Sequence, residues 1–142
     1  MTRKPKAIVL DSWAVIAYLS DEIAGEKVAE IMSEAHENKV PLKMSVLNAG
    51  EVWYSVARQT SAHEADQVID ELREMGIELV DADWRLTRTA ASYKSNRKMS
   101  YADCFAAALA KQENAPLATG DKEFKEVGDE IKVLWLPDNK MG

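Results

Sequence analysis

Four acidic residues spread along the chain stand where carboxylates could do metal-dependent chemistry. Asp11 follows the apolar run at 7–10, and Asp121 follows a second apolar run that begins at Leu117. Glu51 and Asp103 lie near the starts of two segments with helical patterns. Carboxylates that share one pocket need a compensating cation, because each raises the pKa of its neighbours. The sequence has one cysteine and no histidine cluster, so the available oxygen ligands favour Mg²⁺ or Mn²⁺ over zinc.

Each acid also has an ordinary structural explanation. Asp11 and Asp121 precede helical patterns and could simply cap them. Ser100 with Asp103 three residues later imitates a capping box, and an isolated glutamate such as Glu51 is usually solvated. However, Asp103 shares a helix face with several alanines, and an acid in such a setting is seldom buried without a partner. Four acids in such positions are less easily explained by capping or solvation than any one of them alone.

The elements that must position these acids alternate between strands and helices. Runs rich in apolar residues predict strands at 6–10, 42–45, 77–80, 117–119 and 131–136. Helical patterns occupy the intervals at 12–20, 24–38, 47–59, 61–76, 83–98, 100–114 and 121–124. Such alternation predicts an α/β fold with a mainly parallel sheet of about five strands, covered by helices on both faces. Open sheets of this kind bind ligands beyond the carboxyl ends of their strands, where Asp11 and Asp121 are expected.

Two glycines beside these acids also suggest local features of the backbone. Gly50 lies inside a predicted helix, where it costs roughly 1 kcal/mol relative to alanine, and this suggests a close approach at that position. Gly120 follows a predicted strand, where a positive φ would bring the backbone close to a ligand.

Length and composition limit the possible classes of protein. The 142 residues suit a single domain, which we predict to span 1–142. No apolar run approaches the ~20 residues of a membrane span, so we expect no membrane segment. The single cysteine, Cys104, excludes an internal disulfide and suits the reducing cytoplasm. Trp13, Trp53 and Trp135 are expected in the core.

The net charge of −6 argues against a protein that coats nucleic acid, but the charges are unevenly distributed. Residues 85–98 contain five bases and no acid. Arg85, Arg88 and Arg97 are therefore candidate RNA phosphate contacts, with an ordinary solvated helix face as the alternative. Trp84 beside them could stack on a base, although packing in the core is the favoured expectation.

Four short motifs, each built around one of the acids, follow one another from Asp11 to Phe124. They are Asp11-Ser12, Asn48-x-x-Glu51, Ser100-Tyr101-Ala102-Asp103 and Thr119-Gly120-Asp121-Lys122-Glu123-Phe124. This set resembles the four acidic motifs of PIN-domain nucleases, and the length resembles the VapC-type toxins of toxin–antitoxin pairs. The resemblance implies a PIN-like three-layer sandwich, a metal-dependent endoribonuclease acting on RNA, and a cognate antitoxin as inhibitor.

The same resemblance implies roles for individual residues. It makes Asp11, Glu51, Asp103 and Asp121 the catalytic acids, of which Asp11, Asp103 and Asp121 would be direct or water-mediated metal ligands. Ser12, Asn48 and Thr119 would support them. Toxins of this type commonly form homodimers, and the small residues at 106–108 would allow close helix approach unless they pack inside the monomer.

Other readings of the sequence remain open. A housekeeping RNA-processing PIN nuclease would carry the same acids. A phosphatase of the haloacid dehalogenase type requires a second aspartate where this chain has Trp13, and a receiver domain requires an acidic pair where it has Lys4-Pro5-Lys6. A non-catalytic α/β binding module would use the acids only as helix caps and would need no divalent ion.

Overall fold

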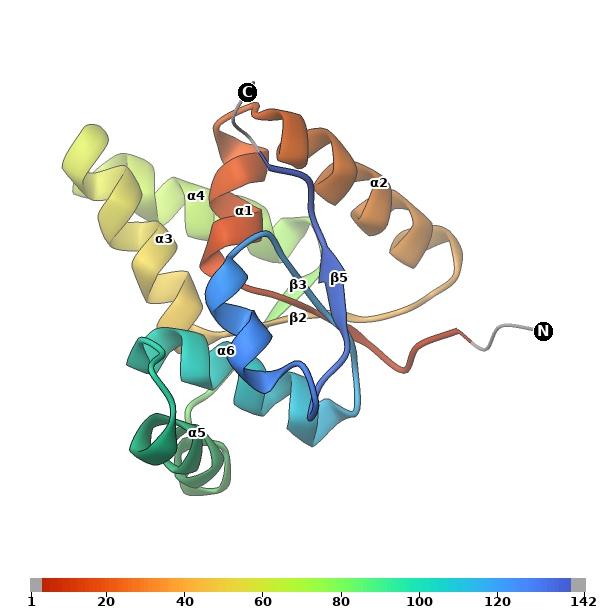
Figure 1. The fold of residues 1–142 in the computed structure, drawn as a ribbon. Helices are drawn as coiled ribbons and strands as arrows, with labels where there is room; N and C mark the ends of the chain where they lie inside the picture. Colours follow the sequence, from red (N-terminus) through yellow and green to blue (C-terminus); the bar gives the residue numbers. More distant parts are fainter. Residues whose placement is uncertain (1–3, 139–142) are drawn as a thin grey trace.

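The sheet at the centre of the molecule has five strands, and all four of its pairings are parallel (Figure 1). The computed structural model describes residues 4–138, and the remaining ends of the predicted domain, 1–3 and 139–142, lie outside the described residues. The strand order is β3-β2-β1-β4-β5. The strands are β1 (Ile8–Leu10), β2 (Leu42–Ser45), β3 (Ile77–Val80), β4 (Leu117–Thr119) and β5 (Val133–Trp135). The predicted α/β fold with a parallel sheet is therefore confirmed.

Helices cover both faces of this sheet. One face carries α1 (Ser12–Leu19), α2 (Ile23–Glu37), α3 (Val46–Gln59) and α4 (Ala62–Glu74). The other face carries α5 (Trp84–Asn96), α6 (Tyr101–Glu113) and the short 3₁₀ helix η1 (Lys122–Val127). No helix within residues 4–138 is long and apolar enough to cross a membrane.

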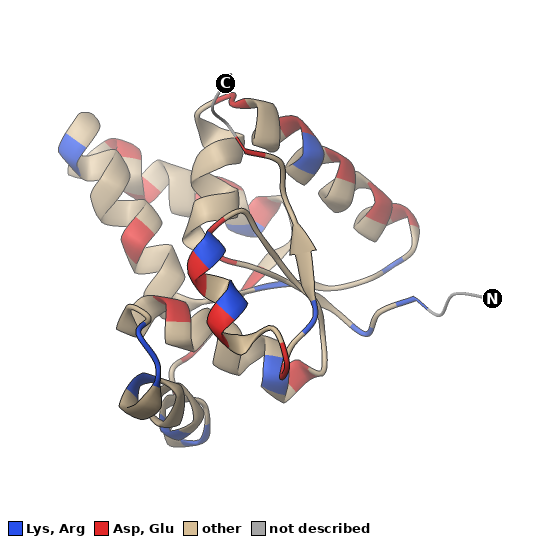
Figure 2. Cartoon of the chain, viewed as in Figure 1, with Lys and Arg blue, Asp and Glu red and all other residues tan. Residues whose placement is uncertain are grey.

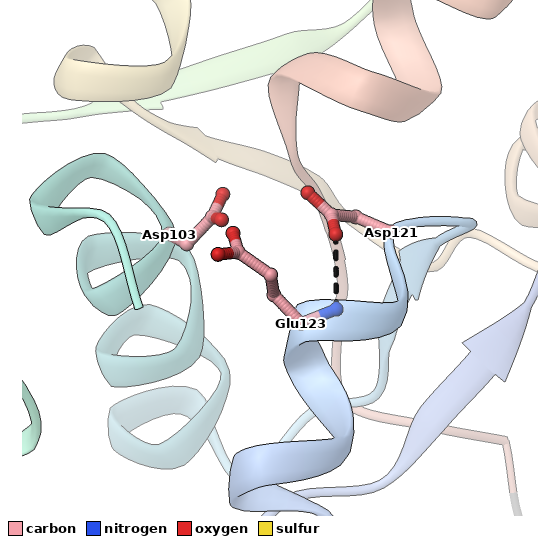
Figure 3. A group of neighbouring side chains, drawn as sticks. All are labelled: Asp103, Asp121 and Glu123. Carbon is pink, nitrogen blue, oxygen red and sulfur yellow. Dashed lines mark hydrogen bonds between the residues drawn. The ribbon is translucent and has the colours of Figure 1, made fainter. Parts of the chain in front are cut away.

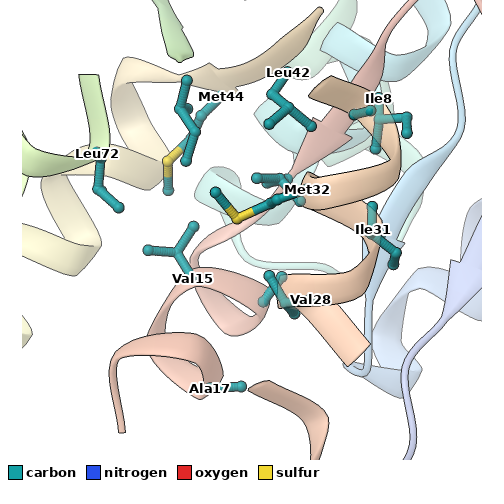
Figure 4. Close-up of a cluster of buried hydrophobic side chains, with 14 of the residues drawn as sticks. Ile8, Val15, Ala17, Val28, Ile31, Met32, Leu42, Met44 and Leu72 are labelled. Carbon is teal, nitrogen blue, oxygen red and sulfur yellow. The ribbon is translucent and has the colours of Figure 1, made fainter. Parts of the chain in front are cut away.

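The alternation of side chains along β1 divides the core into two parts. Ile8 and Leu10 belong to the cluster under α1–α4, whereas Ala7 and Val9 belong to the cluster under α5 and α6. This follows from the two-residue period of a strand, which points successive side chains to opposite faces. Figure 4 shows the first cluster, in which Met44 is fully buried. Truncation of such a side chain to alanine costs about 2–5 kcal/mol.

The second cluster explains the alanines of α6. Ala106, Ala107 and Ala108 are all 0% exposed, because α6 lies directly on the sheet. Small side chains allow that close approach. These alanines therefore pack inside the monomer, and the argument that they form a dimer surface was wrong.

Local capping fixes where the helices begin. A side-chain oxygen at each of the predicted capping positions accepts a hydrogen bond from a backbone N–H in the first turn that follows. These capping residues are Asp11, Ser61, Asp83, Ser100 and Asp121.

The tryptophans lie further out than expected. Trp84 is 72% exposed and Trp135 is 46% exposed, so the expectation that they pack in the core was wrong. Trp84 is the first residue of α5, and the buried side of that helix begins at Leu86. Trp13 is half-buried, and so is Trp53, whose indole N–H donates to Asp66.

Candidate active site

A pocket of about 480 Å³ opens at the carboxyl edge of the sheet. Ser12 in its wall stands two residues after the end of β1, and Asp121 two residues after the end of β4, so the pocket lies beyond the ends of two neighbouring strands. Its wall also contains Glu51 from α3 and Asp103 from α6. Acids that are far apart in the sequence thus meet in one place.

Three carboxylates that line the pocket form a close group: Asp103, Asp121 and Glu123. One oxygen of each lies within 4.8 Å of the others, and Figure 3 shows the three groups pointing toward one another. The backbone N–H of Glu123 donates to Asp121 Oδ1 over 2.9 Å, which fixes the turn between them. The sequence-based set of site residues does not include Glu123. The available signal was an acid two residues after a capping aspartate, where a tight turn brings both side chains to one side.

Asp103 is 7% exposed in this group. Its pKa is raised to about 8, first of all by burial, then by the hydrogen bond with Glu123 and by the charges of Asp121 and Asp11. The Ser100 hydroxyl acts in the opposite direction and lowers the pKa. Without a cation, burial and the neighbouring acidic groups therefore keep Asp103 from ionising readily at neutral pH.

Asp11 is 1% exposed and does not line the pocket. Its Oδ1 accepts from the Ala14 N–H over 2.9 Å, and its Oδ2 accepts from the Thr119 hydroxyl over 2.5 Å. Burial is the main reason that the pKa of Asp11 rises to about 7, although these two hydrogen bonds lower it. Asp11 is thus a helix cap whose charge also acts on the pocket, since it raises the pKa of Asp103.

Thr119 connects Asp11 to the three-carboxylate group. Its hydroxyl accepts from the backbone N–H of Asp121 over 3.0 Å while donating to Asp11. The carboxyl end of β4 is therefore fastened to the carboxyl end of β1 by a buried side chain. The hydrogen bond from the Asp121 N–H to the Thr119 hydroxyl sets the start of the turn that carries Asp121.

Glu51 is held in place by two neighbours. Its Oε1 accepts from the Ser12 hydroxyl over 2.8 Å and from Asn48 Nδ2 over 3.3 Å. Asn48 Nδ2 also donates to the Ala102 carbonyl over 3.2 Å, which ties α3 to α6. The buried Oδ1 of Asn48 has no hydrogen-bond partner within the described part of the chain. Ser12 and Asn48 therefore orient Glu51 at the edge of the pocket.

The two glycines near the site behave differently from our expectations. Gly120 does not have a positive φ, but a Cβ at this position would lie 2.2 Å from the Trp13 ring. The indole packs where a side chain would stand, and this contact is the reason for glycine. Gly50 has nothing within 4 Å of an added Cβ, so the expected close approach there was wrong.

The arginines proposed as phosphate contacts do not line the pocket. The guanidinium of Arg97 pairs with Glu130 at 2.5 Å, donates to the Glu126 carbonyl and lies over the Tyr93 ring. Arg97 is thus committed to contacts within the protein. Arg85 and Arg88 are exposed on α5.

Comparison with known proteins adds a family and a set of similar folds. Residues 8–130 match the PIN domain family. No curated protein sequence matches the chain. A structure of VapBC2 from Rickettsia felis, bound to a promoter DNA fragment, is similar with a TM-score of 0.74 and 16% identity, over 92% of this chain and 99% of that one.

Two further solved structures are similar in the same way. VapBC-1 from nontypeable Haemophilus influenzae has a TM-score of 0.68 and 20% identity, over 91% of this chain and 97% of that one. Mycobacterium tuberculosis VapC20, described as a sarcin–ricin loop cleaving toxin, has a TM-score of 0.66 and 16% identity, over 86% and 95%. At these identities the likeness shows a common fold.

Proposed function

Since this chain belongs to the PIN domain family, we propose that it is a metal-dependent endoribonuclease that hydrolyses RNA phosphodiester bonds. The observation that carries the proposal is the group formed by Asp103, Asp121 and Glu123, whose oxygens lie within 4.8 Å of one another in a pocket. We take residues 1–142 as one PIN domain.

The residues of the pocket fit a divalent cation. All the donors are carboxylate oxygens, which Mg²⁺ and Mn²⁺ prefer. Burial and neighbouring negative charges raise the pKa of Asp103, and a bound cation would offset both effects. Asp103, Asp121 and Glu123 would hold the ion. The assignment of Asp11 as a further ligand stays a prediction from the sequence; each of its oxygens accepts one hydrogen bond in the structure.

The cation, when bound, would neutralise charge on the scissile phosphate and lower the pKa of a water that attacks it. The protein's own residues have separate tasks. Thr119 holds Asp11 and the backbone of Asp121 in register, so the site is built before substrate arrives. Glu51, fixed by Ser12 and Asn48, stands at the pocket edge, where its carboxylate can accept a proton from a water.

We further propose that the protein is the toxin of a toxin–antitoxin pair. Similar folds in Rickettsia felis and Haemophilus influenzae are described as VapBC, and the similar Mycobacterium tuberculosis protein is described as a toxin that cleaves the sarcin–ricin loop. The partner would be an antitoxin protein, and we expect a homodimer. The single cysteine, Cys104, is buried and free, which suits a cytoplasmic location.

The test combines metal binding with cleavage. Calorimetric titration with Mn²⁺ should show binding that weakens at least tenfold in Glu123→Gln and Asp121→Asn, because a ligand oxygen loses its charge. The same variants should lose most Mn²⁺-dependent cleavage of RNA. Asp70→Asn, which changes an exposed carboxyl on α4, is the matched control. Full cleavage by both pocket variants at limiting Mn²⁺, or equal cleavage in EDTA, would contradict the proposal.

A further inference from the structure

One side of α5 is exposed and has an unusual composition. The helix packs against α6 through Leu86, Ala90 and Tyr93, which are buried. Residues at 84, 88, 92 and 95 recur along the opposite side at one-turn intervals, and 85 and 96 flank them. We call this surface the α5 face, and it consists of the exposed residues Trp84, Arg85, Arg88, Ser92, Ser95 and Asn96.

The α5 face is basic in a protein whose net charge is −6. Figure 2 shows α5 carrying basic residues and no acidic ones. Two nearby bases are committed elsewhere, since Arg97 pairs with Glu130 and Lys94 donates to the Met99 carbonyl. Arg85 and Arg88, in contrast, form no ion pair within residues 4–138.

An exposed tryptophan stands at the start of the same face. Trp84 is 72% exposed and comes directly after Asp83, whose side chain accepts from the Leu86 N–H to cap the helix. Because this carboxylate and that of Asp81 precede the helix, the basic stretch begins only at Arg85. The α5 face thus combines an exposed aromatic ring with two exposed arginines that form no ion pair within residues 4–138.

We propose that the α5 face binds the single-stranded RNA outside the acidic pocket, with Trp84 stacking on a base and Arg85 and Arg88 contacting phosphates. Stacking on an aromatic ring together with cationic contacts to the backbone is how proteins hold single strands without reading their sequence. The choice of RNA as ligand rests on the proposed function. The position of the face comes from the structure alone.

The α5 face is connected to the pocket. With 13 residues, α5 is about 20 Å long, and Ser100, four residues after its last residue, caps α6 and lines the pocket. A strand that runs along α5 toward its carboxyl end is therefore led to the residues around Asp103. The helix would supply affinity for the strand, and the pocket would supply the chemistry.

A second copy of this chain is the competing occupant. In a two-fold symmetric dimer the same patch lies on both sides of the interface, so Arg85 and Arg88 of one copy would approach those of the other. Such like-charge contacts oppose association. A polyanion instead complements the charge of the face, and RNA is thus favoured.

The first experiment measures binding in EDTA, where no metal-dependent cleavage occurs. The probe is a fluorescein-labelled 15-nucleotide oligouridine, followed by anisotropy over a range of salt concentrations. Trp84→Ala should weaken binding about tenfold or more, since it removes one stacked base. The double variant Arg85→Gln/Arg88→Gln should lower the slope of log affinity against log salt by about 1.4, which corresponds to two lost contacts to single-stranded phosphates.

The matched control is Arg58→Gln/Arg73→Gln, which removes two exposed arginines from α3 and α4 and changes net charge by the same amount. The control should keep the affinity and salt slope of the wild type. Equal losses in control and test variants would show an effect of total charge and would overturn the proposal. Unchanged RNA binding in the Trp84 and arginine variants would also overturn the proposal. This includes the outcome in which these variants differ from the wild type only in oligomeric state, as measured by sedimentation.

A second experiment separates this proposal from the proposed nuclease activity. With Mn²⁺, the Trp84 and arginine variants should raise KM for the 15-nucleotide RNA and leave kcat close to that of the wild type. A protein that binds the RNA through the α5 face but never cleaves it would contradict the nuclease function alone. A protein that cleaves normally with an unchanged KM in these variants would overturn the role of α5 alone.

Discussion

Without metal, the acidic pocket should make the protein less stable as pH rises, and Asp103→Asn isolates this effect. The folded protein holds a proton on Asp103 up to its pKa of about 8, whereas the unfolded chain releases it near the ordinary value of 3.8. Between these values the folded state binds more protons than the unfolded state. The free energy of unfolding therefore falls as pH rises, by up to about 1.4 kcal/mol per pH unit.

The size of this loss in unfolding free energy follows from the pH interval between the two pKa values of Asp103. From about pH 5.5 to about pH 7.5 the wild type should lose roughly 2–3 kcal/mol of unfolding free energy through Asp103 in EDTA. An amide at 103 does not titrate, so the variant should lack this loss. Asp11, whose pKa is about 7, contributes to the slope of both proteins and cancels in the comparison. The variant should gain roughly 2–3 kcal/mol of unfolding free energy relative to the wild type between the two pH values.

Urea denaturation followed by circular dichroism in EDTA measures this difference. Asp70→Asn on α4 is the control, because its carboxyl is exposed, and it should follow the pH dependence of the wild type. Saturating Mn²⁺ should stabilise the wild type more than Asp103→Asn, since binding to the folded state adds to stability by mass action. Parallel pH profiles of wild type and Asp103→Asn in EDTA would refute the argument that Asp103 is held protonated by burial and by its acidic neighbours.

Four further outcomes are expected. Gly120→Ala should lower the unfolding free energy by about 1–3 kcal/mol in urea, because its Cβ meets the Trp13 ring, and Trp13→Val should recover part of the loss. Thr119→Val should cost about 1–3 kcal/mol by the same measurement, since it leaves a buried oxygen of Asp11 without its donor. Mn²⁺ and the antitoxin should weaken each other's binding in titrations at fixed ionic strength if the antitoxin occupies the pocket, because coupling is reciprocal. Sedimentation of the isolated protein at high micromolar concentration should show a homodimer, and a monomer would count against it.

Local chemistry explains why most element boundaries could be predicted from the sequence. Ser61, Asp83 and Ser100 each combine a favoured capping side chain with a following apolar pattern, and each begins a helix in the structure. The strands at 42–45 and 77–80 also lie where their apolar runs indicated. These signals act within a few residues of one another, so they can be read without the fold.

Contacts between distant segments explain what could not be predicted. The reason for Gly120 is the ring of Trp13, which reaches it only after β1 and β4 pair. Trp84 was expected in the core because it is apolar, but its position on α5 faces away from α6. The strand order, too, depends on tertiary pairing. The four acids could be found because each stands at the end of a strand or the start of a helix.

The acidic pocket and the proposed RNA-binding surface on α5 have opposite charges, and this difference suggests separate contributions to RNA binding. Four carboxyl groups line the pocket where a phosphate of the proposed RNA substrate would bind, those of Glu51, Asp103, Asp121 and Glu123. Such a pocket opposes a polyanion until a cation balances it, so it is a poor source of affinity for the rest of the strand. Affinity must then come from outside the pocket, where salt-sensitive cationic contacts are available. If the α5 face supplies it, RNA should still bind measurably when the pocket is empty of metal, and removal of pocket carboxylates should strengthen that binding rather than weaken it.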